Sequence, residues 1–306
     1  MADSLPTARP ELRVGCPQWN HDAWVGTVSR PGAGSAERLA AYSSWCNTVE
    51  GNTTFYAVPS AKTVAAWAAN TGTSFRFLFK LPRAISHEAR LRDCDDDVAA
   101  FLERLDPLGE RVERLWIQLP PSFGPGDLGV LESFLDRWAG DTEWAVELRH
   151  PAFFERDSAA EHAAESVLRN HFAEWVRFDT TVLFAEPPRT QAEHEGWRSK
   201  PRVGVRARAL TDEPVIRYIG RDDDEATIAG WQRWVPVVAK WLEEGRTPMF
   251  FMHTPGNDRA PLLARRFHAE VAALVADLAP LPEPMPIPAP TATATAPAPE
   301  EPPTLF

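Results

Sequence analysis

The chain has 306 residues, 44% of them hydrophobic, which is enough for a large buried core. Its formal net charge of -11 argues against binding of nucleic acid or anionic membranes through overall charge. The sequence shows no signal peptide, no apolar run long enough to span a membrane and no paired spacing of its three cysteines. We therefore expect a cytoplasmic protein with reduced thiols and no membrane contact.

Short strand-like runs alternate with longer helix-like runs along most of the chain. Strands are predicted at 12–16, 48–52, 75–80, 115–118, 144–147, 175–179, 215–219 and 249–252. The spacing of apolar residues predicts helices at 35–45, 60–69, 95–105, 128–138, 158–171, 226–243 and 260–278. Three of these helices begin at a serine suited to capping, namely Ser35, Ser60 and Ser158. The stretch 187–211 is polar and matches neither pattern.

This alternation predicts an α/β fold, a single-domain (β/α)8 TIM barrel, rather than an open doubly wound sheet. No GxGxxG motif follows the first strand, which argues against a dinucleotide-binding sheet. From residue 280 the chain is rich in proline and alanine, which predicts an extended, disordered tail. The expected organisation is an N-terminal extension at 1–10, a barrel domain at 11–279 and a tail at 280–306.

Polar side chains follow nearly every predicted strand, at the end where a barrel of this kind carries its chemistry. Glu50 and Asn52 show the pattern, because residues two apart on a strand share a face and a buried polar pair needs partners. The predicted catalytic residues are Glu50, Lys80, Glu147 and Asp179. The predicted substrate-binding residues are Gln18, His21, Asn52, Tyr56, His87, Gln118, Arg149, His150, Arg217 and His253.

The segments that carry these residues resemble the YecE-like family, a domain of unknown function. The likeness extends from about Arg13 to Leu278 and rests on GCPQWNH, NTVEGNTTFYAVPS, FRFLFKLPRAISH, LRDCDDD, IQLPPSFGP, VELRHPAFF, VIRYIGRDDD and FMHTPGNDRAP. The resemblance implies a TIM barrel, but it implies no particular reaction. The chain departs from the commoner family pattern after the seventh and eighth predicted strands, so site roles are not transferred from the wider family.

The basic residues at the predicted strand ends favour an anionic ligand, since guanidinium groups bind phosphate oxygens through paired hydrogen bonds. Four such side chains are expected to meet there, namely Lys80, Arg83, Arg149 and Arg217. We expect a hydrolase or lyase that acts on a phosphate- or nucleotide-containing substrate, with Glu50 or Glu147 as general base. Burial would raise the pKa of that glutamate and Lys80 would lower it, so the direction stays open.

A metal-assisted reaction is a second reading of the same strand ends. Its ligand types would be those of zinc or manganese. The candidates are His87, Glu147, His150, Asp179 and His253. The chain has no HxH or HExxH motif, and nearby lysine and arginine would repel a cation, so a divalent metal is the less favoured alternative and the cofactor stays unknown.

A third reading is a non-catalytic, ligand-binding or scaffold barrel that docks a partner through its tail. The chain ends in PPTLF, and Leu305 and Phe306 resemble the last part of peptides bound by bacterial sliding clamps. Pro302 stands where those peptides have glutamine. A clamp partner would place the protein near DNA replication or repair.

Overall fold

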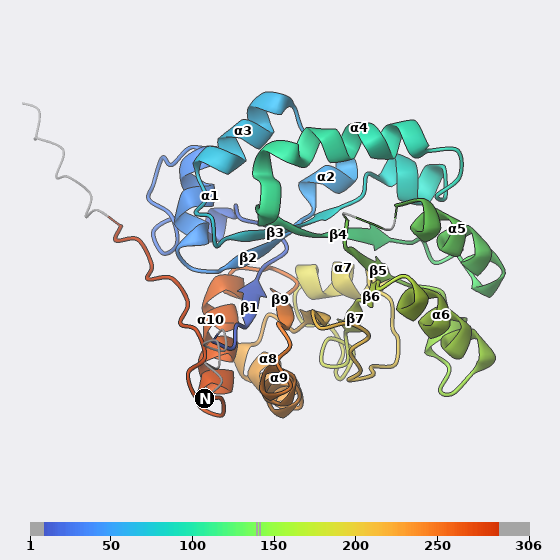
Figure 1. Cartoon of the computed structure of the whole chain (residues 1–306). Coiled ribbons are helices and arrows are strands. Elements are labelled where there is room, and N and C mark those ends of the chain that lie inside the picture. The colour runs from blue at the N-terminus through green and yellow to red at the C-terminus, as the bar shows by residue number, and fades with distance from the viewer. Residues whose placement is uncertain (1–8, 139, 141, 288–306) are drawn as a thin grey trace, which may run out of the picture.

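The strands of the computed structural model, which describes residues 9–287 apart from 139 and 141, pair in parallel and form two sheets. One sheet has the order β1-β9-β8-β7 and the other the order β2-β3-β4-β5-β6 (Figure 1). The strands are β1 (Arg13–Gly15), β2 (Thr48–Gly51), β3 (Arg76–Lys80), β4 (Val112–Gln118), β5 (Trp144–Glu147), β6 (Glu174–Trp175), β7 (Arg177–Asp179), β8 (Val215–Ile219) and β9 (Met249–His253).

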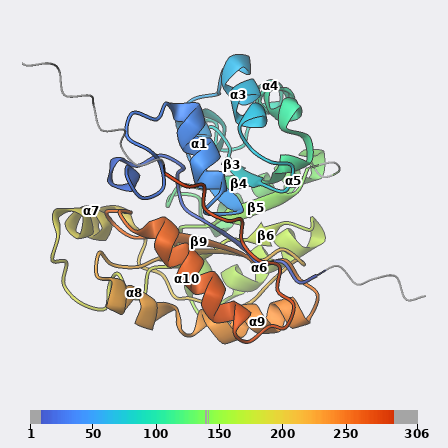
Figure 2. The same cartoon turned by 90° about the vertical axis from the view of Figure 1, so that its left-hand side faces the viewer.

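Helices surround the two sheets. Figure 2 shows α1, α3, α4 and α5 on one side of the molecule and α8, α9 and α10 on the opposite side. The helices are α1 (Ser35–Ser43), α2 (Thr53–Tyr56), α3 (Ala61–Ala69), α4 (Asp95–Leu105), α5 (Leu128–Trp138), α6 (Ala159–Asn170), α7 (Gln191–Ser199), α8 (Asp224–Trp231), α9 (Trp234–Glu243) and α10 (Ala260–Ala272). In the described part of the chain, no helix is long and apolar enough to cross a membrane.

The two sheets approach each other along both edges. Between β1 and β2, the backbone N–H of Glu50 donates to the carbonyl of Cys16 at 3.0 Å. At the other edge, only Val176 separates β6 from β7, and its N–H donates to the carbonyl of Val146 at 2.9 Å. The fold is therefore α/β with parallel sheets, in an arrangement consistent with a TIM-like barrel.

Side-chain alternation along the strands separates an interior from a helix-facing surface. An apolar interior cluster consists of Leu78, Trp116, Ala145, Val176, Val215, Met249 and Phe251. Two residues further along six of these strands, the same face carries Lys80, Gln118, Glu147, Phe178, Arg217 and His253. The polar residues predicted at the strand ends thus lie directly above an apolar layer.

Each predicted strand region contains a strand, although 175–179 is interrupted. The helix predicted at 226–243 is wrong as one element, because it is divided into α8 and α9. Ser60 and Ser158 cap their helices, with each hydroxyl accepting a backbone N–H, as predicted. Ser35 does not, because Gly34 is the N-cap of α1.

The first part of the proline-rich segment packs against the body of the protein. Leu281 is buried, and the N–H of Met285 donates to the hydroxyl of Ser44 at 2.9 Å. Figure 2 shows this segment running back from α10 across α1. Residues 280–287 form no helix or strand, as expected, but Leu281 is buried and the segment is therefore not fully solvated. Residues 288–306 lie outside the described residues.

Candidate functional site

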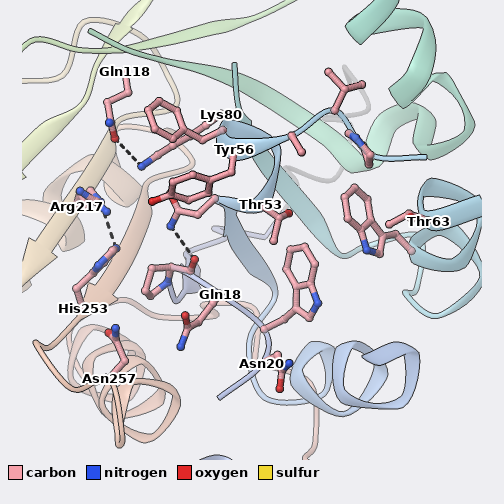
Figure 3. Close-up of a pocket in the computed structure, with 18 of the residues that line it drawn as sticks. Gln18, Asn20, Thr53, Tyr56, Thr63, Lys80, Gln118, Arg217, His253 and Asn257 are labelled. Carbon is pink, nitrogen blue, oxygen red and sulfur yellow. Dashed lines mark hydrogen bonds between the residues drawn. The ribbon is translucent and has the colours of Figure 1, made fainter. Parts of the chain in front are cut away.

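A pocket with a volume of about 910 Å³ opens at the carboxyl ends of the strands. This volume is typical of sites for small molecules. Figure 3 shows side chains from several strands and loops around it, with Lys80 joined to Gln118 and Arg217 joined to His253. The predicted substrate-binding or catalytic residues that line the pocket are Gln18, Asn52, Tyr56, Lys80, Gln118, Arg149, Arg217 and His253.

Glu50 lies fully buried beneath the pocket and has three polar neighbours. Lys80 Nζ lies 2.6 Å from its Oε1 atom, and Arg217 Nε donates to its Oε2 atom at 3.0 Å. His253 Nε2 lies 2.8 Å from the same Oε2 atom. The partners that a buried glutamate requires are therefore residues from β3, β8 and β9.

Both buried glutamates are held in their ionised form. Burial alone would raise the pKa of Glu50, but the charges of Arg217 and Lys80 lower it well below its usual range. For Glu147, Arg149 and Arg217 outweigh burial and lower the pKa to about 2. Efficient general acids and bases have a pKa near the working pH, so neither carboxylate is tuned for proton exchange at neutral pH. The sequence left open whether the pKa of the buried glutamate is raised or lowered, and in the structure it is lowered for both Glu50 and Glu147.

Two lysines of the pocket lining titrate near neutral pH. Burial and the charge of Arg217 lower the pKa of Lys80 to about 8, while Glu50 limits the shift. Burial and the same arginine lower the pKa of Lys200 to about 7. A proton can therefore be exchanged at these two amines under physiological conditions.

His253 is uncharged at neutral pH, because burial and the neighbouring Arg217 lower its pKa to about 3. Its Nε2 atom lies 2.8 Å from a carboxylate oxygen of Glu50 and 3.2 Å from Arg217 Nε. Since Nε2 cannot donate and accept at once, the shorter contact with a pure acceptor favours donation to Glu50. His253 then positions the glutamate without adding charge.

Of the buried atoms beside the pocket that lack a hydrogen-bond partner among the described residues, two form a long ion pair. They are Arg217 Nη1 and Glu147 Oε2, which lie 3.9 Å apart. The other carboxylate oxygen of Glu147, Oε1, accepts a hydrogen bond from Arg149 Nε at 2.5 Å. Unsatisfied buried polar groups cost free energy, so this part of the buried framework is incompletely paired.

Positive side chains outnumber negative ones at this site. The basic residues that line the pocket are Lys80, Arg149, Lys200 and Arg217. The carboxylates beneath it are Glu50 and Glu147. A cavity with such an excess of positive charge can attract an anion even though the whole protein is acidic.

Asp179 does not line the pocket, so the structure does not bring it together with the other predicted catalytic residues. Phe178 is the residue of β7 that faces Arg149 and Arg217. Asp179 therefore points to the opposite face, where its Oδ2 atom accepts from Trp234 Nε1 at 2.7 Å and pairs with Arg233. It connects β7 to the start of α9.

Two of the predicted histidines begin short helical turns and do not line the pocket. His21 Nδ1 accepts the backbone N–H of Ala23 at 3.2 Å. His150 Nδ1 accepts that of Ala152 at the same distance. The structure does not bring these two histidines to the pocket lining, and the Nδ1 atom of each is used by the backbone.

His87 and Arg83 lie outside the pocket lining as well. The ring of His87 packs edge to face against Phe55, with centroids 5.0 Å apart. Burial and the charge of Arg149 lower the pKa of His87 to about 4. Arg83 is largely exposed, and its nearest carboxylate is Glu88. Neither side chain contributes directly to the charge of the pocket.

The donors considered for a metal are dispersed. In residues 9–287, with 139 and 141 left out, no group of three or more histidine, cysteine, aspartate or glutamate side chains could hold a metal ion. His150 and Asp179 are engaged elsewhere, and Glu147 pairs with an arginine. The side chains of the pocket suit an anion better than a cation.

Lys200 is the basic residue of the pocket lining that the sequence analysis missed. It directly follows α7, in the stretch 187–211 to which no structure was assigned. A compositional signal was present, because only four of the 32 basic residues are lysines. They are Lys62, Lys80, Lys200 and Lys240. Two of these four rare lysines line the pocket.

Solved structures with the same fold exist. Crystal structures of a DUF72 family protein from Enterococcus faecalis V583 and of one from Thermotoga maritima MSB8 each align with a TM-score of 0.63. The alignments cover 88% and 85% of this chain and 98% of each of those chains, at 18% and 20% identity. At this identity the likeness supports the fold alone.

Sequence comparison agrees with the resemblance noted above. The UPF0759 protein YecE of Escherichia coli, in strains K12 and O157:H7, is 38% identical over 271 residues, which cover 89% of this chain and 96% of that protein. The family described as "Protein of unknown function DUF72" matches residues 13–287. The chain therefore belongs to the DUF72 family.

Proposed function

We propose that the pocket binds a small anionic substrate bearing a phosphate group, and that the protein acts on it as an enzyme. The main support is the buried framework of Glu50 and Glu147, which holds Arg217, Lys80 and Arg149 in place at the pocket. We also propose that the two sheets form one eight-stranded barrel, because active sites of such barrels lie at this end of the strands.

Arg217 is the best candidate for the central contact to the anion. Its Nε atom donates to Glu50, and the residue lines the pocket. Burial of its ion pairs also restricts its motion, so little conformational entropy is lost on binding. Phosphate oxygens can therefore meet a preorganised guanidinium group.

Of the two reaction classes expected from the sequence, the pKa values favour a lyase over a glutamate-assisted hydrolase. A hydrolase of that kind needs a carboxylate that exchanges a proton near neutral pH. The pKa of Glu147 is about 2, and that of Lys80 is about 8. Lysine acid–base chemistry suits the breaking of a bond next to a carbonyl group.

One rim of the pocket is aromatic. Tyr56 is 81% exposed and packs edge to face with Phe55, at 5.3 Å between ring centroids. Both residues line the pocket. An exposed aromatic ring can stack on a sugar or a base, so the rim favours a ligand with a ring, such as a nucleotide.

Titration calorimetry with inorganic phosphate tests the anion site. We expect Lys200→Gln to weaken phosphate binding about tenfold or more, because it removes a positive charge from the lining of the pocket. The matched control is Lys240→Gln, because Lys240 is an exposed lysine on α9 and its loss changes the net charge equally.

The two variants separate a specific site from a general charge effect. Equal losses of affinity in Lys200→Gln and Lys240→Gln, or no phosphate binding by the unmodified protein, would contradict the proposal. Adenosine 5′-monophosphate extends the test to the aromatic rim. It should bind more tightly than phosphate, and Tyr56→Ala should remove that advantage.

A further inference from the structure

The two lysines of the pocket differ in their partners. Lys80 Nζ is held between Glu50 Oε1 at 2.6 Å and Gln118 Oε1 at 2.8 Å. Lys200 has no carboxylate within 4.0 Å of its amine among the described residues, although it lies at the same pocket. The two amines are therefore suited to different roles. Lys80 is suited to remain a paired cation, and Lys200 is suited to act as a nucleophile.

The backbone around Lys200 is held on both sides. Its N–H donates to the carbonyl of Gly196 at 2.8 Å, which ends α7. The following carbonyl, that of Pro201, accepts from the hydroxyl of Thr180 at 3.0 Å. A residue before proline avoids the helical region, so the chain must leave the helix at Lys200. The backbone position from which the Lys200 side chain extends is therefore fixed.

A buried ion pair holds α7 in place. Arg221 Nε and Nη2 donate to the two carboxylate oxygens of Glu193 at 3.1 and 2.8 Å, and both side chains are 2% exposed. Trp197 Nε1 also donates to the carbonyl of Leu183 at 2.8 Å. This anchoring supports a defined position for the lysine that follows the helix.

Space for a reaction is available on more than one side of Lys200. The residue lines both the main pocket and an adjoining cavity of about 180 Å³, as do His253 and Asn257. Burial, and then the charge of Arg217, lower its pKa to about 7. A lysine beside other cations is more often neutral and is then a nucleophile.

We propose that Lys200 forms an imine with the carbonyl carbon of the substrate, which makes the ligand of this pocket a phosphate ester that carries an aldehyde or ketone. The inference rests on the proposed anion site. Arg217, Arg149 and Lys80 hold the phosphate group, and Lys200 reaches the carbonyl group from the end of α7. The imine then serves as the electron sink for a lyase reaction.

The step balances without a further reactant. The lone pair of neutral Lys200 Nζ forms a bond to the carbonyl carbon, and the carbonyl oxygen takes a proton, which gives a carbinolamine. The carbon–oxygen bond then breaks, and the oxygen leaves as water after taking up a second proton. One of these protons comes from the amine and the other from solvent. The product is a protonated imine with one positive charge.

Pyridoxal 5′-phosphate is a suitable probe, because it joins an aldehyde to a phosphate group, and borohydride makes its imines permanent. After reduction, peptide mapping separates the four lysines and the α-amino group. At pH 7.5 an ordinary lysine is neutral in about one molecule in a thousand. We expect Lys200 to be labelled at least about tenfold faster than Lys62 and Lys240, and inorganic phosphate to protect it.

The rate of labelling should also depend on pH in a characteristic way. Lys200 should reach half of its maximal rate near pH 7, because burial and the charge of Arg217 lower the pKa of its amine to about 7. Pyridoxal without the phosphate group should label Lys200 at least about tenfold more slowly, because the anion contacts are missing. Preferential labelling of Lys80 would overturn the assignment.

Two substitutions separate the imine from the anion site. Lys200→Arg keeps the positive charge but lacks a neutral amine, so it should retain phosphate binding and lose labelling. Lys200→Met should lose labelling and weaken phosphate binding. Normal phosphate binding without labelling of the unmodified protein overturns the imine alone. Absence of phosphate binding overturns the proposed function, and labelling of Lys200 that phosphate does not reduce overturns the link between them.

Discussion

Glu50 explains why an acidic protein can maintain a basic pocket. It is completely buried, and Arg217, Lys80 and His253 all contact it. A buried charge of this kind is tolerated because it is paired and hydrogen-bonded, not because the pair itself adds much stability. The glutamate is better described as a positioning residue for the cations than as the general base expected from the sequence.

Glu50→Gln should lower the free energy of unfolding at pH 7 by about 3–5 kcal/mol, because it leaves buried Lys80 and Arg217 without a carboxylate. Urea denaturation measures this change, and Glu103→Gln on the exposed surface of α4 is the control. Adding Lys80→Met should restore part of the loss, since both partners are then absent. A Glu50→Gln protein as stable as the original would contradict this role.

The same variant has a consequence for acid stability. The pKa of Glu147 is about 2 and that of Glu50 is lowered well below its usual range, so both stabilise the fold above the unfolded-state value of about 4.3. Their contribution is lost as the pH falls from about 4.3 through the folded-state values. As the pH falls below about 4.3, the Glu50→Gln protein should therefore lose less stability than the unmodified protein.

At the scale of the elements, the alternation of one strand decides which side chains reach the pocket. Phe178 and Asp179 are neighbours on β7, so they point to opposite faces. The aromatic ring lies beneath Arg149 and Arg217, and the carboxylate lies beneath α9. Asp179 therefore connects a strand to a helix, a role that its position at a strand end did not reveal.

Asp179→Asn separates these two roles. It should lower the free energy of unfolding by about 1–3 kcal/mol, because bonds to Trp234 and Arg233 lose a charged acceptor. Phosphate affinity, measured by calorimetry, should not change. Asp277→Asn, at an exposed position, is the control for stability. If Asp179→Asn weakened phosphate binding and left the stability unchanged, Asp179 would have a role in binding at the pocket instead.

At the scale of the whole molecule, two regions of the C-terminal segment must be distinguished. Residues 280–287 lie against α1, where Met285, Pro286 and Ile287 line a small cavity together with residues of that helix. Leu305 and Phe306 lie outside the described residues. The docking alternative for the tail is therefore tested by removing its last residues.

Removal of Thr304–Phe306 tests the docking alternative. If the tail binds a bacterial sliding clamp, the shortened protein should no longer be retained on immobilised clamp, because the two apolar anchor residues are gone. Its phosphate affinity should equal that of the full chain, which confirms that the fold is intact. Equal retention of the shortened and full-length proteins would exclude this partner.

Local patterns in the sequence were sufficient to locate the strands and most helices, and to bring Lys80, Gln118, Arg217 and His253 to one end of the molecule. These features depend on residues a few positions apart, and alternation and helical spacing record them directly. The pKa of Glu50, the outward direction of Asp179 and the arrival of Lys200 at the pocket required the tertiary structure. Each depends on distances between residues far apart in the chain, and charge interactions, which set the chemistry of the site, are functions of those distances.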